Sequence, residues 1–100
     1  MKEEYKMAKE SLIQSERQCY ICRTEIGLHL HHIYGGPNRS ISDNDGCYVY
    51  LCQKHHTGPA GVHFNPKIDQ TLKERCEMAW LQYYSKNIDD FIARYGKNYL

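Results

Sequence analysis

The sequence contains two short pairs of potential zinc ligands. Cys19 and Cys22 form the first pair, and Cys52 and His55 form the second, each with two residues between its members. This spacing lets one tight turn present both side chains to one ion, and thiolate and imidazole ligands suit tetrahedral zinc. The two pairs therefore predict a structural zinc site. Cys47 is a rival fourth ligand, but the four residues between it and Cys52 make a less usual turn.

Five histidines lie outside these pairs, namely His29, His31, His32, His56 and His63. A single histidine is usually an ordinary polar side chain, but core packing does not require so many imidazoles beside a zinc site. His31 and His32 are adjacent, and adjacent residues of a strand point to opposite faces. We therefore expect one of them to bind a catalytic metal ion and the other to act nearby as a base, because an imidazole titrates near neutral pH and suits both roles.

The length and composition explain why the chain would need a metal. The 100 residues fit one domain. The aliphatic content is low, with seven Leu, eight Ile and two Val. A small domain with so few core residues is marginally stable unless a disulfide or a metal holds it together. Zinc binding can supply an apparent folding free energy on the order of 10 kcal/mol.

The same composition excludes several classes of protein. No apolar run approaches the roughly 20 residues of a membrane span, and the first ten residues, MKEEYKMAKE, lack an apolar signal-peptide core. We therefore expect a cytoplasmic protein without membrane contacts, in which an odd number of cysteines, five, favours metal binding over disulfides. A net charge of +1 excludes a basic arm that coats nucleic acid by bulk electrostatics.

The pattern of apolar and turn-forming residues predicts the elements that position these side chains. We expect a strand over 26–34, a loop over the turn-forming segment 35–46, and a second strand over 47–51. The segment that starts at Cys52 should open a helix or a tight turn. Charged helix-forming residues predict a partly exposed N-terminal helix within residues 1–16.

The C-terminal third is predicted to be helical. Residues 67–85 have the spacing of a long amphipathic helix. Its apolar face would contain Ile68, Leu72, Cys76, Ala79, Trp80 and Tyr83. Asn87 or Asp89 could cap a last short helix, and Gly96 lies where the C-terminal cap of that helix is expected.

In their order along the chain, these motifs resemble those of the HNH nuclease family with its ββα-metal fold. The similar stretch covers roughly residues 19–65 and contains CxxC, HHIYGGPNR, LC-x2-HH and GVHFN, and it is most similar to small phage-encoded HNH proteins. The resemblance implies an α+β fold in a single domain of residues 1–100. A zinc-stapled ββα-metal core, treble-clef-like, would occupy residues 17–66, between the N-terminal helix of residues 1–16 and the C-terminal helices of residues 67–100.

The resemblance also implies a role for four of the remaining histidines. It makes His31 and His56 ligands of a catalytic ion, with His63 as an additional ligand of the kind that some family members have. It makes His32 the general base that activates water. The catalytic ion would be Mg or Mn, and Zn or Ni stay open as alternatives because imidazole ligands favour them.

One position of the family pattern differs in this chain. The central Asn of the family corresponds by spacing to Cys47. In the family, this Asn orients the base or holds the metal. Asn38 or Asn44 would have to supply the orienting amide instead, although Asn38 is equally well explained as a turn residue beside Pro37.

The resulting hypothesis is a metal-dependent DNA endonuclease that hydrolyses phosphodiester bonds with one ion and a histidine base. It would act on double-stranded or branched DNA in phage or prophage recombination, replication or packaging inside a bacterial cell. Arg39 and Lys54 would contact phosphates. The alternative is a non-catalytic zinc-binding module for nucleic acid or protein, which would not need His31, His32 or His56. An RNA-directed nuclease would use the same site.

Overall fold

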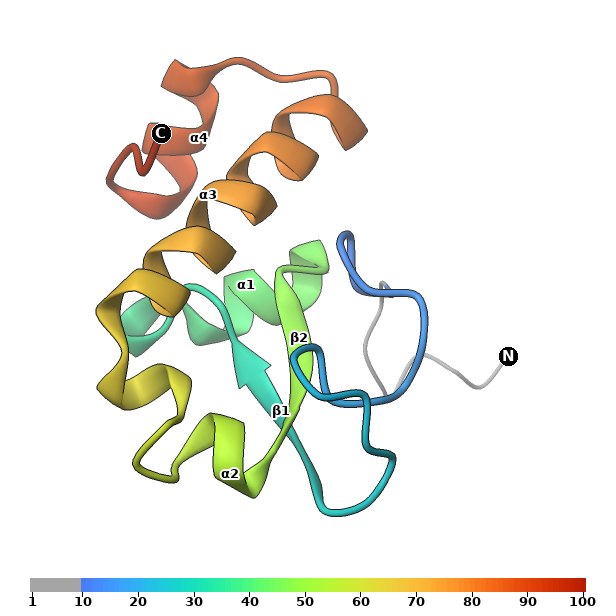
Figure 1. Ribbon diagram of the computed structural model, residues 1–100. Coiled ribbons are helices and arrows are strands. Elements are labelled where there is room, and N and C mark those ends of the chain that lie inside the picture. The colour runs from blue at the N-terminus through green and yellow to red at the C-terminus, as the bar shows by residue number, and fades with distance from the viewer. Residues whose placement is uncertain (1–9) are drawn as a thin grey trace.

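An antiparallel pair of strands forms the centre of the protein, whose computed structural model describes residues 10–100 (Figure 1). Strand β1 spans Leu28–His32 and strand β2 spans Tyr48–Cys52, and the two are paired over their whole length. Both predicted strands are confirmed, with β2 one residue later than expected. Together with four α-helices, this sheet makes the described part of the chain an α+β fold.

The alternation of side chains along β1 sends its histidines in two directions. His29 and His31 lie on one face of the strand, and His32 lies on the other. Helix α2, Gln53–His56, follows β2 without a break and packs against both strands. The short 3-10 helix η3, Val62–Phe64, contacts α2 in turn. These two elements therefore bring further side chains beside the histidines of β1.

The segment between the strands is helical, so the predicted loop over residues 35–46 is wrong. A 3-10 turn, η2, covers Gly36–Asn38, and helix α1 covers Arg39–Asp45. Pro37 stands in the first turn, and Gly46 ends α1 with a φ of +88°. Pro, Ser, Asn and Asp favour helix starts as well as loops, so the composition of a short segment does not separate the two.

Helix α3, Pro66–Tyr83, confirms the predicted long helix of residues 67–85. Asn65 begins the helix, because its side-chain oxygen accepts hydrogen bonds from two backbone N–H groups of the first turn. The observed face buries Leu72, Cys76 and Trp80 as expected, adds Glu77 and leaves Tyr83 exposed. No described helix, α3 included, combines the length and apolar character that a membrane span requires.

Helix α4, Ile88–Tyr95, is the predicted last short helix. Asn87 caps it by accepting a hydrogen bond from the backbone N–H of Asp90, while its own backbone N–H donates to the Asp90 carboxylate. Gly96 ends the helix in the left-handed conformation, with a φ of +88°. The N-terminal cap is therefore Asn87 rather than Asp89.

The helix expected at the N-terminus is wrong where the structure tests it. Residues 1–9 lie outside the described residues, and residues 10–16 contain no helix. The side chain of Gln14 accepts a hydrogen bond from the backbone N–H of Tyr50 over 2.8 Å. The Ser11 hydroxyl donates to the backbone carbonyl of Tyr48, also in β2, over 2.6 Å. Bonding to the edge of β2 overrides the helix propensity of this segment.

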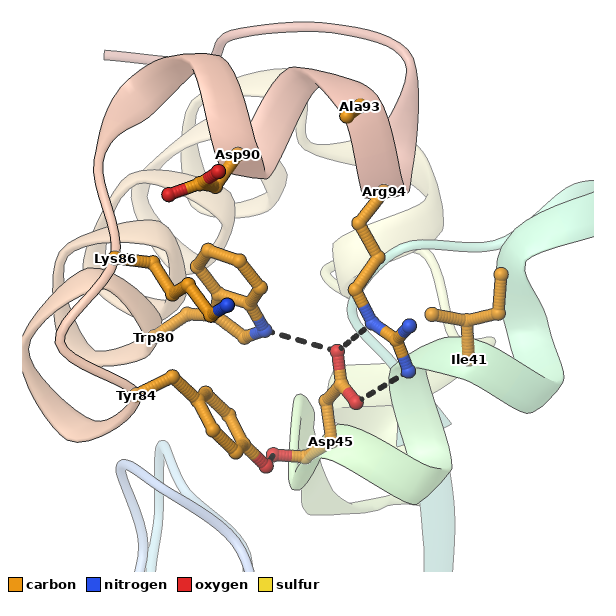
Figure 2. Close-up of a pocket in the computed structure, with 8 residues that line it drawn as sticks. All are labelled: Ile41, Asp45, Trp80, Tyr84, Lys86, Asp90, Ala93 and Arg94. Atoms are coloured by element: carbon orange, nitrogen blue, oxygen red, sulfur yellow. Dashed lines mark hydrogen bonds and ion pairs between the residues drawn. The ribbon is translucent and has the colours of Figure 1, made fainter.

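Asp45, the last residue of α1, joins that helix to α3 and α4. Its carboxylate accepts hydrogen bonds from Trp80 over 2.9 Å, from Tyr95 over 2.8 Å and from Nη2 of Arg94 over 2.7 Å. Figure 2 shows the Trp80 and Arg94 bonds beside an open groove of about 630 Å³. Residues distant in sequence are thus held around one buried carboxylate.

Candidate metal centres

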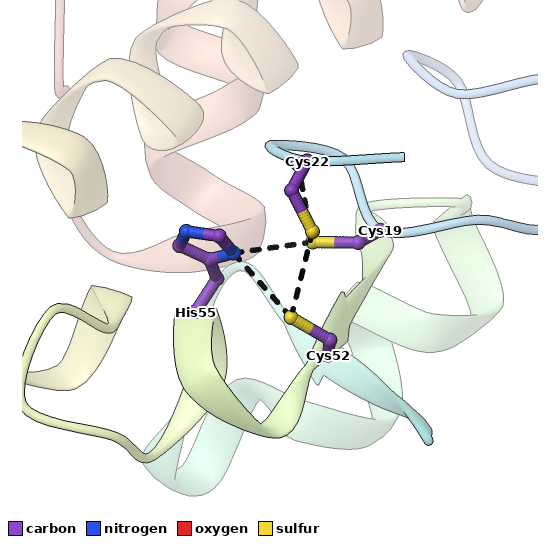
Figure 3. Close-up of side chains that lie close together, drawn as sticks. All are labelled: Cys19, Cys22, Cys52 and His55. Atoms are coloured by element: carbon purple, nitrogen blue, oxygen red, sulfur yellow. Dashed lines mark hydrogen bonds between the residues drawn. The ribbon is translucent and has the colours of Figure 1, made fainter. Parts of the chain in front are cut away.

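Cys19, Cys22, Cys52 and His55 form a tight cluster where β2 meets α2 (Figure 3). Their potential ligand atoms all lie within 4.8 Å of one another. The Sγ atoms of Cys22 and Cys52 are 3.7 Å apart, and Nδ1 of His55 lies 3.4 Å from Sγ of Cys52. Around a tetrahedral ion with metal–sulfur bonds of about 2.3 Å, two sulfur atoms would be about 3.8 Å apart. The cluster therefore has the dimensions of a tetrahedral metal site.

Backbone hydrogen bonds shape the turn that carries the first cysteine pair. The N–H of Arg23 donates to the carbonyl of Cys19, and the N–H of Cys19 donates to the carbonyl of Thr24, each over 2.8 Å. The N–H of Tyr20 donates to the carbonyl of Tyr50 over 2.8 Å, which fixes the turn to β2. Because β2 and α2 supply the other two ligands, one strand brings both pairs together.

The environment of Cys19 favours its thiolate form. Burial raises the pKa of this thiol, but backbone N–H groups of Cys22, Cys52 and Ile21 outweigh that effect and lower the pKa to about 6. A thiolate, rather than a thiol, binds metal ions. The folded chain therefore prepares one of the four side chains for metal binding by hydrogen bonding alone.

Cys47, the rival fourth ligand, lies away from this cluster. It is fully buried, and its Sγ is 3.7 Å from the hydroxyl of Tyr95. The contact with Cys47, together with burial, raises the pKa of the Cys76 thiol. Both thiols belong to the core, as expected for Cys76, and His55 completes the four-residue cluster instead.

His31 of β1, His56 of α2 and His63 of η3 form a second cluster. Their ring nitrogens lie within 4.8 Å of one another, and the Nε2 atoms of His56 and His63 are 3.2 Å apart. A glycine makes this possible, since a Cβ at Gly61 would lie only 2.7 Å from the carbonyl oxygen of His56. The close backbone approach at Gly61 places η3, and with it His63, beside α2.

Burial favours the neutral form of two imidazoles in this cluster, those of His31 and His56. His31 is 6% exposed, and its Nε2 is buried without a hydrogen-bond partner among the described protein atoms. Burial, together with the neighbouring His56 and His63, lowers the pKa of His31 to about 4. Burial and the neighbouring His63 and His29 also lower the pKa of His56. A neutral imidazole has the free lone pair that metal binding requires.

His29 is a member of this site that the sequence analysis left without a role. Its Nδ1 lies 3.0 Å from Nδ1 of His56, so one of the two rings donates a hydrogen to the other. If Nε2 of His56 binds a metal beside His63, then Nδ1 of His56 carries the hydrogen and Nδ1 of His29 accepts it. The signal was present in the sequence, because His29 and His31 share one face of a strand.

Asp43 is the second residue that sequence reasoning missed. Nδ1 of His32 lies 2.7 Å from a carboxylate oxygen of Asp43 on α1. The expected orienting residue, Asn38, is not beside His32. Its side-chain amide donates instead to the carbonyl of Tyr95 over 3.1 Å. Asp43 therefore takes the place expected for Asn38. The sequence analysis could not find this contact, because it predicted a loop where α1 packs against β1.

A cavity of about 390 Å³ adjoins these histidines, and His31, His32 and His63 line it. Its other wall comes from α3. Arg39 and Lys54, the expected phosphate contacts, are exposed on α1 and α2 and do not line this cavity.

Comparisons with known proteins identify no relative. No family model, curated protein or solved structure matches the chain. The interpretation of the two clusters therefore rests on their geometry and on the motifs of the sequence.

Proposed function

We propose that the protein is a metal-dependent DNA endonuclease of the HNH type. One observation carries the proposal: three histidine nitrogens converge within 4.8 Å beside a fourth histidine that a carboxylate orients. A non-catalytic zinc module has no use for the second cluster. The order of β1, β2 and α2 supports a ββα-metal core, with the cysteine-containing cluster as its structural zinc site.

The residues of the second cluster fit a divalent ion. The buried Nε2 of His31 has no hydrogen-bond partner among the described residues, and His56 and His63 offer ring nitrogen atoms beside it. A bound ion there would stabilise negative charge on the phosphate and on the leaving oxygen. We propose Mg or Mn in this role, with Zn or Ni as alternatives that suit imidazole ligands.

His32 is proposed as the general base. Asp43 accepts a hydrogen from Nδ1 of His32, which leaves the lone pair of Nε2 free to take a proton from water. His32 lines the cavity, and its side chain is 35% exposed, so water can reach it. Asp43 acts as a positioning residue, because it fixes the tautomer and the orientation of the ring.

The proposed substrate is double-stranded or branched DNA, in the setting of a phage or prophage. Arg39 and Lys54 are exposed on elements that flank the histidines, so phosphates beyond the cavity could reach them. RNA has the same phosphodiester linkage and stays a further candidate substrate. The net charge of +1 supports only modest electrostatic affinity for either polymer.

The decisive experiment is nicking of supercoiled plasmid by zinc-loaded protein with Mg²⁺, Mn²⁺, Ni²⁺ or Zn²⁺ added. We expect His32→Ala to reduce the cleavage rate by roughly 10²- to 10⁴-fold, because it removes the base. Asn38→Ala is the matched control, and we expect it to cleave like the wild type, since its amide bonds to Tyr95 away from the cavity.

Two outcomes would count against the nuclease. Equal nicking by wild type and His32→Ala would show that His32 is not the base. No nicking by wild type with any ion, despite one tightly bound zinc, would favour the non-catalytic zinc-binding module.

A further inference from the structure

Helix α3 forms the second wall of the cavity beside the histidines. Asp69 and Lys73, one helical turn apart, line this wall opposite His31 and His32. Lys73 is the only lysine or arginine among the described residues that line the cavity. One ammonium, paired with the Asp69 carboxylate, therefore lies beside the space where the proposed reaction would occur.

Contacts on several sides restrain the side chain of Lys73. Its ammonium lies 2.9 Å from a carboxylate oxygen of Asp69 and 5.4 Å from the ring centroid of Tyr99. The side chain is only 23% exposed. The hydroxyl of Tyr34 donates to the carbonyl of Lys73 over 2.6 Å, which ties this turn of α3 to the core. The ammonium is thus held in place before any ligand arrives, which lowers the entropic cost of binding an anion.

We propose that Lys73 binds a non-bridging oxygen of the DNA phosphodiester that enters this cavity. The inference rests on the proposed nuclease function and identifies the contact that holds the substrate at that site. A phosphate oxygen and the Asp69 carboxylate are both oxyanions, so either can neutralise the ammonium. An ammonium acts on phosphate as a point charge, so the contact would strengthen binding to every DNA sequence equally.

DNA affinity tests this assignment directly. Lys73→Met keeps the length of the side chain and removes its charge, and Lys67→Met is a matched control because Lys67 lies on the same helix but outside the cavity. Both are made in a His32→Ala background to prevent cleavage. Binding is measured by fluorescence anisotropy of a labelled duplex with Mn²⁺ at several salt concentrations.

We expect Lys73→Met to weaken binding roughly 10- to 100-fold, because a hydrogen bond to a charged group is lost. The slope of log affinity against log salt should fall by about 0.9, the value for one released phosphate counterion. Lys67→Met should stay closer to the parent in both quantities. Thermal melting should show that all three proteins remain folded.

The possible results separate this inference from the proposed function. Unchanged affinity and salt slope in Lys73→Met would overturn the inference, and so would a loss of Mn²⁺ binding, which would make Lys73 a support of the metal site. If the wild type does not nick plasmid but Lys73→Met lowers DNA affinity, the contact stands and the nuclease fails. If the wild type nicks plasmid and Lys73→Met, made without the His32→Ala change, nicks with an unchanged KM, only the contact fails. Binding of RNA without DNA would overturn both.

Discussion

At the scale of single residues, the proposed histidine site depends on two hydrogen bonds that set imidazole tautomers. Asp43 accepts from Nδ1 of His32, and the Nδ1 atoms of His29 and His56 share a hydrogen over 3.0 Å. Each bond decides which nitrogen of the imidazole keeps a free lone pair. The partners are therefore as important as the rings that face the cavity, since outer contacts commonly tune metal sites.

The bond between His29 and His56 predicts an effect on metal affinity. We expect His29→Leu to weaken binding of Mn²⁺ or Ni²⁺ by roughly 10- to 100-fold, because His56 loses the acceptor that orients it. His29→Gln should recover part of the affinity, since its amide oxygen can accept the same hydrogen. Isothermal titration of zinc-loaded protein measures both changes. Wild-type affinity in His29→Leu would show that His56 does not need this partner.

At the scale of elements, the cysteine-containing cluster of Cys19, Cys22, Cys52 and His55 joins an irregular segment to the sheet. The turn of residues 19–22 contains no helix or strand, and the cluster connects it to the end of β2 and the start of α2. A metal at this point would replace the apolar contacts that so short a sheet cannot provide.

This arrangement predicts that Cys22 is essential for zinc binding and Cys47 is not. We expect Cys22→Ala to lose zinc and to unfold, because structural zinc contributes apparent folding free energy on the order of 10 kcal/mol. Cys47→Ala should retain one zinc per chain, since Cys47 contacts Tyr95 in the core. Metal analysis and thermal melting of the purified variants test the pair. An unchanged melting curve and zinc content in Cys22→Ala would contradict the structural site.

The sequence predicted those parts of the site that depend on local spacing. Two ligands three residues apart in a turn or a short helix point toward the same ion because of the local backbone geometry. The members of the cysteine-containing cluster could therefore be predicted from their motifs. Asp43 could not be assigned, because its contact with His32 depends on α1 packing against β1. Residues 10–16 were misassigned for a related reason, since their bonds to β2 are tertiary.

At the scale of the whole molecule, the carboxylate of Asp45 connects segments that are up to 50 residues apart in the sequence. It is 6% exposed and bonds to Trp80, Arg94 and Tyr95, which belong to the C-terminal helices. Burial alone would raise the pKa of Asp45, but the bonds from Arg94, Tyr95 and Trp80 outweigh it, and the pKa is lowered. The C-terminal helices are therefore attached to the strand-containing half through an ionised group.

This ionised group predicts how stability depends on pH. Because the folded pKa lies below the unfolded value of about 3.9, the carboxylate stabilises the fold fully above that pH, and the contribution is lost as the pH falls through the folded pKa. We expect Asp45→Asn to lower the free energy of unfolding at pH 7 by about 2 to 3 kcal/mol, since hydrogen bonds to a charged group are lost. Urea unfolding of wild type and variant should show a constant difference from pH 7 to 5 that narrows below about pH 4.

Asp89→Asn, at an exposed position of α4, should change stability by less than about 0.5 kcal/mol. A difference that persists unchanged into acid would mean that Asp45 acts through packing rather than charge.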